Sequence, residues 1–299
     1  MPVHQRRKIY GSVFSAALAV GLLIQFMPFL LYAFFDQYVI LELGITAIYA
    51  LALLIPAAVW YCFAKNDMPS LDKNRLKYPP AAIFISLGVI TVAAYVNYFA
   101  VVPFSASGIF VNTESSPVIE SVFYAVNFAV RSVIIAPICE EIFFRGFVLR
   151  RLSPLGSRRA LIISSLIFSM FHTNAAQFIY TFVAGALFGW ITLMTGKIRH
   201  AIIIHMINNG ISVGATLLSL YYSPQSVGIA YSRVDFLLIF AAVISAVFIF
   251  IRKMSDSSLY SVKNAPPEHD GRYAVSVSMI LYIVFTVSIT ALINLSIFN

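Results

Sequence analysis

Long, uninterrupted runs of apolar residues dominate the chain, and short polar stretches separate them. Most runs approach or exceed the roughly 20 residues that an α-helix needs to cross the ~30 Å hydrocarbon core of a membrane. A helix satisfies its own backbone hydrogen bonds there, which lipid cannot do. We therefore expect an all-α, polytopic membrane protein with about eight or nine transmembrane helices. The apolar segments lie at about 10–35, 38–64, 80–104, 119–145, 159–173, 176–196, 199–222, 234–251 and 273–298.

Composition agrees with this pattern. Of the 299 residues, 60% are hydrophobic and 11% are charged, whereas a soluble domain carries roughly 25% charged residues. An outer-membrane β-barrel would instead alternate apolar and polar positions within strands of ~10 residues. The first run, at about 10–35, is too long for the apolar core of a cleavable signal peptide. We expect it to remain as the first transmembrane helix.

The basic residues fall at alternate junctions between the segments, with Arg233 as the exception, and the net charge is +8. Because cytoplasmic loops carry an excess of Lys and Arg, we predict an integral, multi-pass protein with a cytosolic N-terminus. Its membrane would be the plasma membrane if the chain is bacterial. Loops facing the cytosol explain the charge, so we expect a lipid bilayer and no nucleic acid as partner. The basic clusters span residues 6–8, 65–77, 145–159, 197–199 and 252–272.

We expect one membrane domain in three parts. N-terminal transmembrane helices cover 1–118, core helices cover 119–222, and C-terminal transmembrane helices cover 223–299. The two cysteines, Cys62 and Cys139, both lie in apolar segments. They form neither a disulfide framework nor a cysteine-based zinc pattern.

Two adjacent acids, Glu140 and Glu141, interrupt the fourth apolar segment. A charged side chain at the centre of a membrane costs about 2.5 kcal/mol or more, so such a pair indicates a functional site. Glu141 and Arg145 share a helical face, four residues apart, which predicts an ion pair. Glu140 is rotated by about 100° and has no cation near it in sequence, so it suits a general base. The alternative is that all three residues form the cytosolic end of the segment.

Two later segments each supply a histidine. Glu140 lies about 12 residues before the turn at 153–157 and His172 about 15 residues after it. At a rise of 1.5 Å per residue, both reach a similar depth on adjacent antiparallel helices. His205 and Asn209 are one turn apart and can direct two donors to one point, as an oxyanion hole requires. The alternatives are an interfacial role for His172 and helix–helix hydrogen bonding for His205 and Asn209.

Other polar and small residues favour structural roles. We expect Arg131, in the middle of the fourth segment, to pair with a carbonyl group, with Glu120 or with Glu42. Anchoring of a substrate carboxylate is the alternative. Gly185 and Gly189 form a small-xxx-small pattern in the sixth segment, which predicts close packing against another helix.

Taken together, the polar residues of the core form three motifs in a fixed order. They resemble the motifs of the CAAX-protease and bacteriocin-processing family, also called CPBP or Abi, which includes the Ras-converting prenyl endopeptidases. The matching region runs from about Ser121 to Val213. The resemblance implies an intramembrane endopeptidase, with helices around an intramembrane cavity, that acts on a membrane-associated protein or peptide. The motifs are Glu140-Glu141-x-x-x-Arg145, Phe168-x-x-x-His172 and His205-x-x-x-Asn209.

The same resemblance implies a role for each motif residue. Glu140 with His172 would activate the attacking water. His205 and Asn209 would stabilise the oxyanion of the tetrahedral intermediate. The supporting residues would be Glu141, Arg145 and Phe168, the last of which would shape the pocket.

Metal dependence and function both have alternatives. We expect no metal cofactor, because the chain has no His-Glu-x-x-His helix and the resemblance implies a glutamate-and-water mechanism. Zinc held by Glu140, His172 and His205 is the alternative. A non-enzymatic immunity or binding protein that uses the same cavity is the alternative function. A transporter is a weaker one, because the sequence shows no internal repeat.

Overall fold

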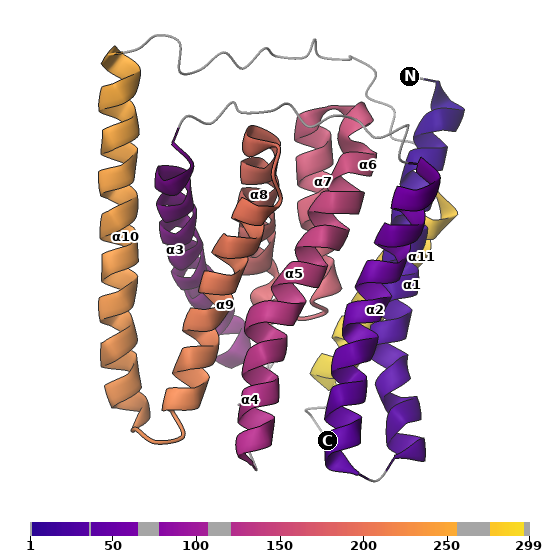
Figure 1. Cartoon of the computed structure of the whole chain (residues 1–299), viewed down its shortest axis with the longest axis horizontal. Helices are drawn as coiled ribbons and strands as arrows, with labels where there is room; N and C mark the ends of the chain where they lie inside the picture. The colour runs from indigo at the N-terminus through magenta and orange to yellow at the C-terminus, as the bar shows by residue number, and fades with distance from the viewer. Residues whose placement is uncertain (1, 36, 65–77, 107–120, 256–275, 296–299) are drawn as a thin grey trace.

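The computed structural model describes residues 2–35, 37–64, 78–106, 121–255 and 276–295, and the secondary structure in these ranges is helical (Figure 1). The expected all-α fold is confirmed. In chain order the elements are α1 (Val3–Phe34), α2 (Tyr38–Ala64), α3 (Pro79–Ala106), α4 (Val122–Val130), η2 (Arg131–Ile135), α5 (Ala136–Glu141), η3 (Ile142–Leu149), α6 (Arg150–Leu152), η4 (Ser153–Leu155), α7 (Ser157–Phe171), η5 (Ala175–Gln177), α8 (Phe178–Thr195), α9 (Arg199–Leu218), α10 (Pro224–Ser255) and α11 (Val277–Leu295).

Within the described ranges, seven helical stretches are long and apolar enough to cross a membrane, by length and composition. Two further helices accompany them. Helix α7 has 15 residues, and the apolar part of α11 covers 277–291, both short of the roughly 20 residues of a perpendicular span. Each predicted apolar segment nevertheless coincides with a helix over the residues that the structure describes.

The stretch from α4 to α6 is one continuous helical path that carries two wider π-helical turns. It begins where the Ser121 hydroxyl accepts a 3.1 Å hydrogen bond from the Tyr124 amide and caps the helix. The first π-turn, η2, ends two residues before Pro137, the second residue of α5. A proline lacks the N–H of an ordinary helix and clashes with the preceding turn, so a locally wider turn accommodates it.

Close packing of α7 against α8 depends on two glycines. A Cβ at Gly185 would lie 3.0 Å from Cδ1 of Phe168, and one at Gly189 would lie 2.6 Å from Cδ1 of Leu161. The small-xxx-small pattern thus allows the close approach that the sequence predicted.

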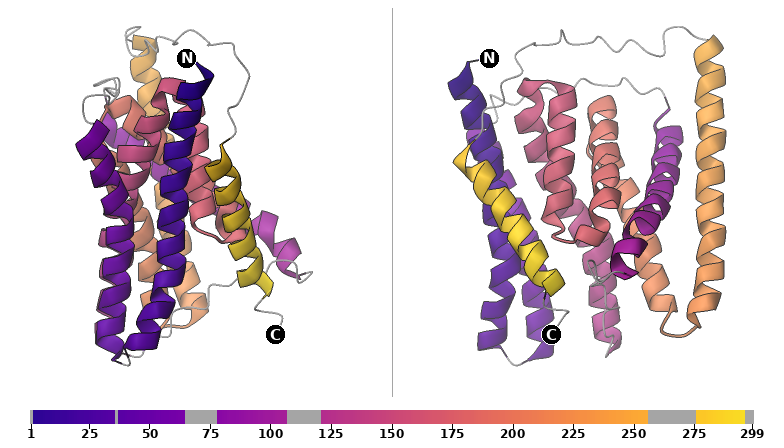
Figure 2. Two further views of the ribbon diagram at one scale, coloured as in Figure 1. Left: turned by 90° about the vertical axis from the view of Figure 1, so that its right-hand side faces the viewer. Right: turned by 180° about the vertical axis from the view of Figure 1, so that it is seen from behind.

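The helices stand side by side, with α10 and α3 at one edge and α1, α2 and α11 at the other (Figures 1 and 2). Helices α5 and α9 lie between these edges. The N-terminal end of α1, the turn between α6 and α7 and the C-terminal end of α10 lie at one end of the molecule (Figure 1). These are junctions that carry basic clusters. The arrangement agrees with the predicted topology, while the cytosolic placement of that end stays a prediction.

Candidate active site

The two adjacent glutamates end helix α5 and are both buried, with exposed fractions of 4% for Glu140 and 0% for Glu141. Glu141 forms the predicted ion pair: Arg145 Nη1 donates to its Oε1 over 3.1 Å. Arg145 Nη2 also donates to the Gly185 carbonyl over 2.9 Å, and its guanidinium lies 4.5 Å from the ring centre of Phe168. Glu141 and Arg145 therefore form a buried link between α5, η3 and α8.

His205 connects the two glutamates from helix α9. Its Nδ1 lies 3.0 Å from Glu141 Oε1, and its Nε2 lies 3.9 Å from Glu140 Oε2. The ring stacks on Phe188, with centroids 4.8 Å apart. Hydrogen bonding and stacking together fix the orientation of the imidazole, which is buried.

Glu140 has a different environment from Glu141. The Tyr49 hydroxyl of α2 donates a hydrogen bond to Glu140 Oε1. The other oxygen, Oε2, is buried without a hydrogen-bond partner among the described residues, as Glu141 Oε2 is too. A buried polar atom without a partner is rare in folded proteins and calls for an explanation. At this position the explanation is chemical, because Glu140 lines a cavity.

This cavity has a volume of about 240 Å³ and lies between α1, α2, α5, α11 and the end of α7. Glu140, His172 and Tyr49 all line it. The predicted meeting of Glu140 and His172 is therefore present in the fold. Tyr49 was not predicted, although it shares a polar face of α2 with Glu42 and Thr46, at a helical spacing of seven and three residues.

His172 immediately follows α7, and its ring is held by its neighbours. Its Nδ1 lies 2.8 Å from the Phe168 carbonyl oxygen. A carbonyl oxygen only accepts, so Nδ1 carries the proton and Nε2 of a neutral ring is an acceptor. The Phe168 ring packs edge-on against His172, with centroids 4.8 Å apart, and lies 5.9 Å from the ring of His205.

The residue after His172 has an unusual backbone. Thr173 has φ of 48°, which is a strained region for a β-branched residue. The Gln25 side-chain amide of α1 donates to its hydroxyl over 3.3 Å. Both residues line the cavity, so this strained turn fixes the edge of the site nearest His172.

The proposed oxyanion donors do not line this cavity. Asn209 Nδ2 donates to the Ser132 carbonyl over 2.9 Å, and His205 bonds Glu141 as described. Both contacts join α9 to the stretch from η2 to α5. They are the interhelical hydrogen bonds that the alternative interpretation described, and the oxyanion role stays a prediction.

Arg131 pairs with Glu42, one of its predicted partners. Its Nη1 lies 3.3 Å from Glu42 Oε2, which also accepts from Asn127 Nδ2 over 3.2 Å. Thr46 lies 3.5 Å from Asn127 Oδ1. The other expected acid, Glu120, lies outside the described residues.

The donors required for a metal centre are not gathered in this arrangement. In the described ranges, no group of three His, Cys, Asp or Glu side chains lies in a position to hold a metal ion. The imidazole of His205 is held by Glu141, and Nδ1 of His172 is held by a carbonyl. These contacts engage Nδ1 of both rings and not Nε2, which is the usual arrangement of histidines that ligate a metal, and metal dependence stays a prediction.

Comparison with known proteins bears on these motifs. The family model described as Rce1-like, type II CAAX prenyl endopeptidase Rce1-like, matches residues 122–211. No curated protein and no solved structure matches. The matched stretch runs from α4 into α9 and contains all three motifs, and it supports a CAAX-type intramembrane endopeptidase in general terms. The resemblance inferred from the motifs is thus confirmed: residues 122–211 match the model of the Rce1-like CAAX prenyl endopeptidases.

Proposed function

We propose that this protein hydrolyses a peptide bond of a membrane-associated protein or peptide, with Glu140 and His172 activating the water. One observation carries the assignment beyond the family match. Glu140 lines a cavity that His172 also lines, and its Oε2 is buried without a hydrogen-bond partner among the described residues.

The two side chains are complementary to a water molecule. Oε2 of an ionised Glu140 and Nε2 of a neutral His172 are both hydrogen-bond acceptors. One water molecule can therefore donate a hydrogen bond to each. Glu140 takes a proton as the water oxygen attacks the carbonyl carbon, and a tetrahedral intermediate forms. The C–N bond then breaks, and Glu140 returns the proton to the leaving nitrogen. This is general base followed by general acid catalysis.

The remaining motif residues act around this step. Arg145 neutralises Glu141 over 3.1 Å, and Glu141 in turn orients His205 over 3.0 Å. For the oxyanion, Asn209 keeps one amide N–H beyond the one donated to Ser132. His205 Nε2 becomes a donor when the ring is doubly protonated, so both residues retain the capacity to stabilise negative charge.

Cavity size favours a substrate that enters as a narrow segment. At about 240 Å³, the cavity is smaller than the 300–1,000 Å³ typical of sites for whole drug-sized ligands. It suits the few atoms around a scissile bond, with the rest of the substrate in the bilayer or at its surface. The Rce1-like family name makes polypeptides with a prenylated C-terminus one class to test, and unprenylated membrane peptides are another.

The test compares membranes from cells that carry wild type or Glu140→Gln. Glutamine preserves size and removes the base, so we expect uncleaved precursors to accumulate with the variant. Mass spectrometry of protein N- and C-termini would identify the precursors and the bond that is cut.

Glu42→Gln is the matched control. Glu42 is a buried carboxylate of α2 with an exposed fraction of 7%, and it does not line the cavity. It should leave the terminal peptides unchanged, provided that both variants insert and unfold at similar temperatures. Identical termini in wild type and Glu140→Gln membranes would overturn the proposal.

A further inference from the structure

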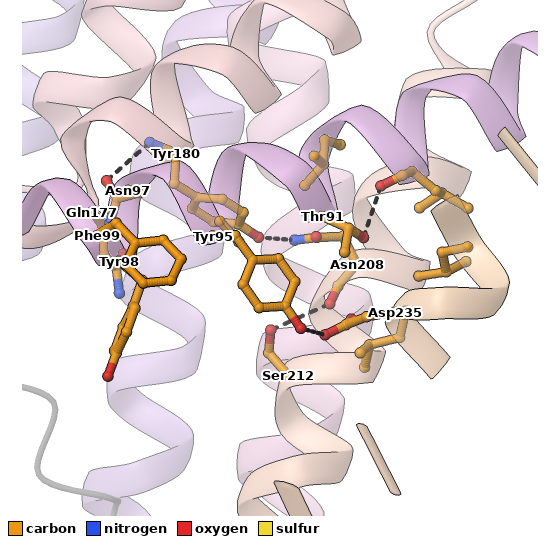
Figure 3. A pocket seen from close by; sticks show the side chains of 15 residues that line it. Thr91, Tyr95, Asn97, Tyr98, Phe99, Gln177, Tyr180, Asn208, Ser212 and Asp235 are labelled. Carbon is orange, nitrogen blue, oxygen red and sulfur yellow. Dashed lines mark hydrogen bonds between the residues drawn. The ribbon is translucent and has the colours of Figure 1, made fainter. Parts of the chain in front are cut away.

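A second cavity, of about 540 Å³, lies between α3, α8, α9 and α10 (Figure 3). None of the motif residues lines it, so it is separate from the cavity of Glu140 and His172. Its wall combines tyrosine rings, side-chain amides and one carboxylate, that of Asp235. The proposed peptidase activity does not use these groups.

Asp235 is a carboxylate inside an apolar helix. It lies 11 residues into α10, roughly 16 Å from the helix end, within an apolar span that covers 224–252. The Tyr95 hydroxyl of α3 donates to Asp235 Oδ2 over 2.8 Å, and Figure 3 shows the two side chains pointing at each other. No ion pair involves Asp235 in the part of the chain that the structure describes. An ionisable residue within a membrane span indicates a functional site.

The nearest basic residue on the same helix does not pair with Asp235. Arg233 lies two residues before Asp235, so its side chain is rotated by about 200° around α10. It does not line the cavity. The negative charge of Asp235 therefore faces a space that lacks a cation of its own among the described residues.

The polar groups around Asp235 are mainly acceptors. Tyr95 uses its proton on Asp235. The side-chain amide nitrogen of Asn208 donates to the Tyr180 hydroxyl over 2.5 Å and to Asn209 Oδ1 over 3.3 Å. The side-chain oxygen of Asn208, Oδ1, is left to accept. One carboxylate and two neutral acceptors suit a group with several N–H donors and a positive charge. The tyrosine rings of the wall add faces that attract cations.

From this chemistry we infer that the cavity binds the protonated primary amine of a membrane amphiphile. An ammonium group provides three hydrogen-bond donors and a positive charge to balance the carboxylate of Asp235. A neighbouring cavity of about 510 Å³ between α9 and α10 shares Ile211, Ser212 and Asp235 with the first. It reaches Ser219 and Pro224 at the α9–α10 turn. The joined space leads from that turn to Asp235, and the hydrocarbon part of the ligand lies along the apolar faces of α3 and α10.

The test measures binding of radiolabelled dodecylamine to the full chain in phosphatidylcholine nanodiscs, with unlabelled dodecanol and dodecanoate as competitors. We expect only unlabelled dodecylamine to compete well. Asp235→Asn keeps the shape and removes the charge, and it should weaken dodecylamine binding by about 10- to 100-fold, the range of a lost hydrogen bond to a charged group.

Glu42→Gln and Glu140→Gln remove buried carboxylates elsewhere, so they should bind dodecylamine as wild type does. Thermal unfolding of Asp235→Asn shows whether the variant is folded. The competition experiment with dodecanol and dodecanoate uses the wild-type protein, so it does not depend on the folding of this variant. Equal competition by dodecanol, or unchanged affinity in folded Asp235→Asn, overturns the inference. Replacing phosphatidylcholine with phosphatidylethanolamine separates the sources: weaker dodecylamine binding supports an aminophospholipid headgroup, and unchanged binding supports a single-chain amine.

Discussion

At the scale of single residues, the two acids differ in what holds them. Glu141 is bound by Arg145 and His205 through one oxygen. Glu140 is bound by Tyr49 through one oxygen, and it lines the cavity, which Glu141 does not. Tyr49 therefore holds one oxygen of the Glu140 carboxylate, and Oε2 is left without a hydrogen-bond partner among the described residues. We regard Tyr49 as a positioning residue for the proposed base, Glu140.

Tyr49→Phe tests this role. Loss of one hydrogen bond to a charged group frees the Glu140 carboxylate to rotate, so we expect kcat to fall by about 10-fold, or about 1.4 kcal/mol, with KM little changed. Steady-state kinetics on the substrate identified through the Glu140→Gln comparison would measure both constants.

Tyr282→Phe is the matched control for that variant. Tyr282 lines the same cavity, but its hydroxyl donates to the Ile167 carbonyl over 2.9 Å and ties α11 to α7. Its loss should lower the unfolding temperature and leave kcat nearly unchanged. An equal fall of kcat in both variants would assign Tyr49 to stability alone.

Sequence predicted the proximities within the core helices but not the contact that reaches them from α2. Glu141 with Arg145 followed from a spacing of four, and Glu140 with His172 from counting residues around one turn. Tyr49 lies 91 positions before Glu140, and the sequence does not fix the rotation of α2 against α5. The polar spacing of Glu42, Thr46 and Tyr49 was the available signal for that face.

At the scale of elements, the π-turn η2 changes which residues face α2. Arg131 and Glu140 are nine residues apart, and an unbroken α-helix would place them about 180° apart. Both nevertheless contact α2, through Glu42 and Tyr49. The wider turn at 131–135 changes the rotation between them. Apolar runs predict helices but not their widened turns, so this feature was beyond the sequence analysis.

The α7–α8 contact offers a prediction at this scale. In Gly185→Ala the new methyl group would lie 3.0 Å from Phe168 Cδ1 and 3.3 Å from Ser165 Cα. Because one contact is backbone and the other is the ring that packs against His172, we expect a loss of stability of about 1–3 kcal/mol together with a fall in activity. Thermal unfolding in detergent and the cleavage assay would measure the two effects.

Gly146→Ala is the control for this substitution. Its Cβ would meet no atom closer than 4.0 Å, and alanine favours a helix over glycine by about 1 kcal/mol. We expect unchanged or slightly raised stability and unchanged activity. If Gly185→Ala behaved in the same way, the close packing of α7 on α8 would not control the position of Phe168.

At the scale of the whole molecule, the distribution of charge and the arrangement of the helices predict the same orientation in the membrane. The basic start of α1, the α6–α7 turn and the basic end of α10 share one end, and the α9–α10 turn lies at the other (Figure 1). Such a one-sided distribution predicts that the basic end is cytosolic. Helix α5, which ends in the two glutamates of the candidate site, would then approach the cytosol through η3 and α6.

Cysteine labelling of intact cells tests this orientation. Both native cysteines are free thiols, so Cys62→Ala/Cys139→Ala gives a background without reactive side chains. Ser157→Cys reports on the α6–α7 turn, and Tyr222→Cys reports on the α9–α10 turn, where the native side chain is 61% exposed. A membrane-impermeant maleimide should label Tyr222→Cys in intact cells and Ser157→Cys only after permeabilisation. The reverse pattern would invert the orientation, and labelling of both in intact cells would contradict a membrane between these two turns.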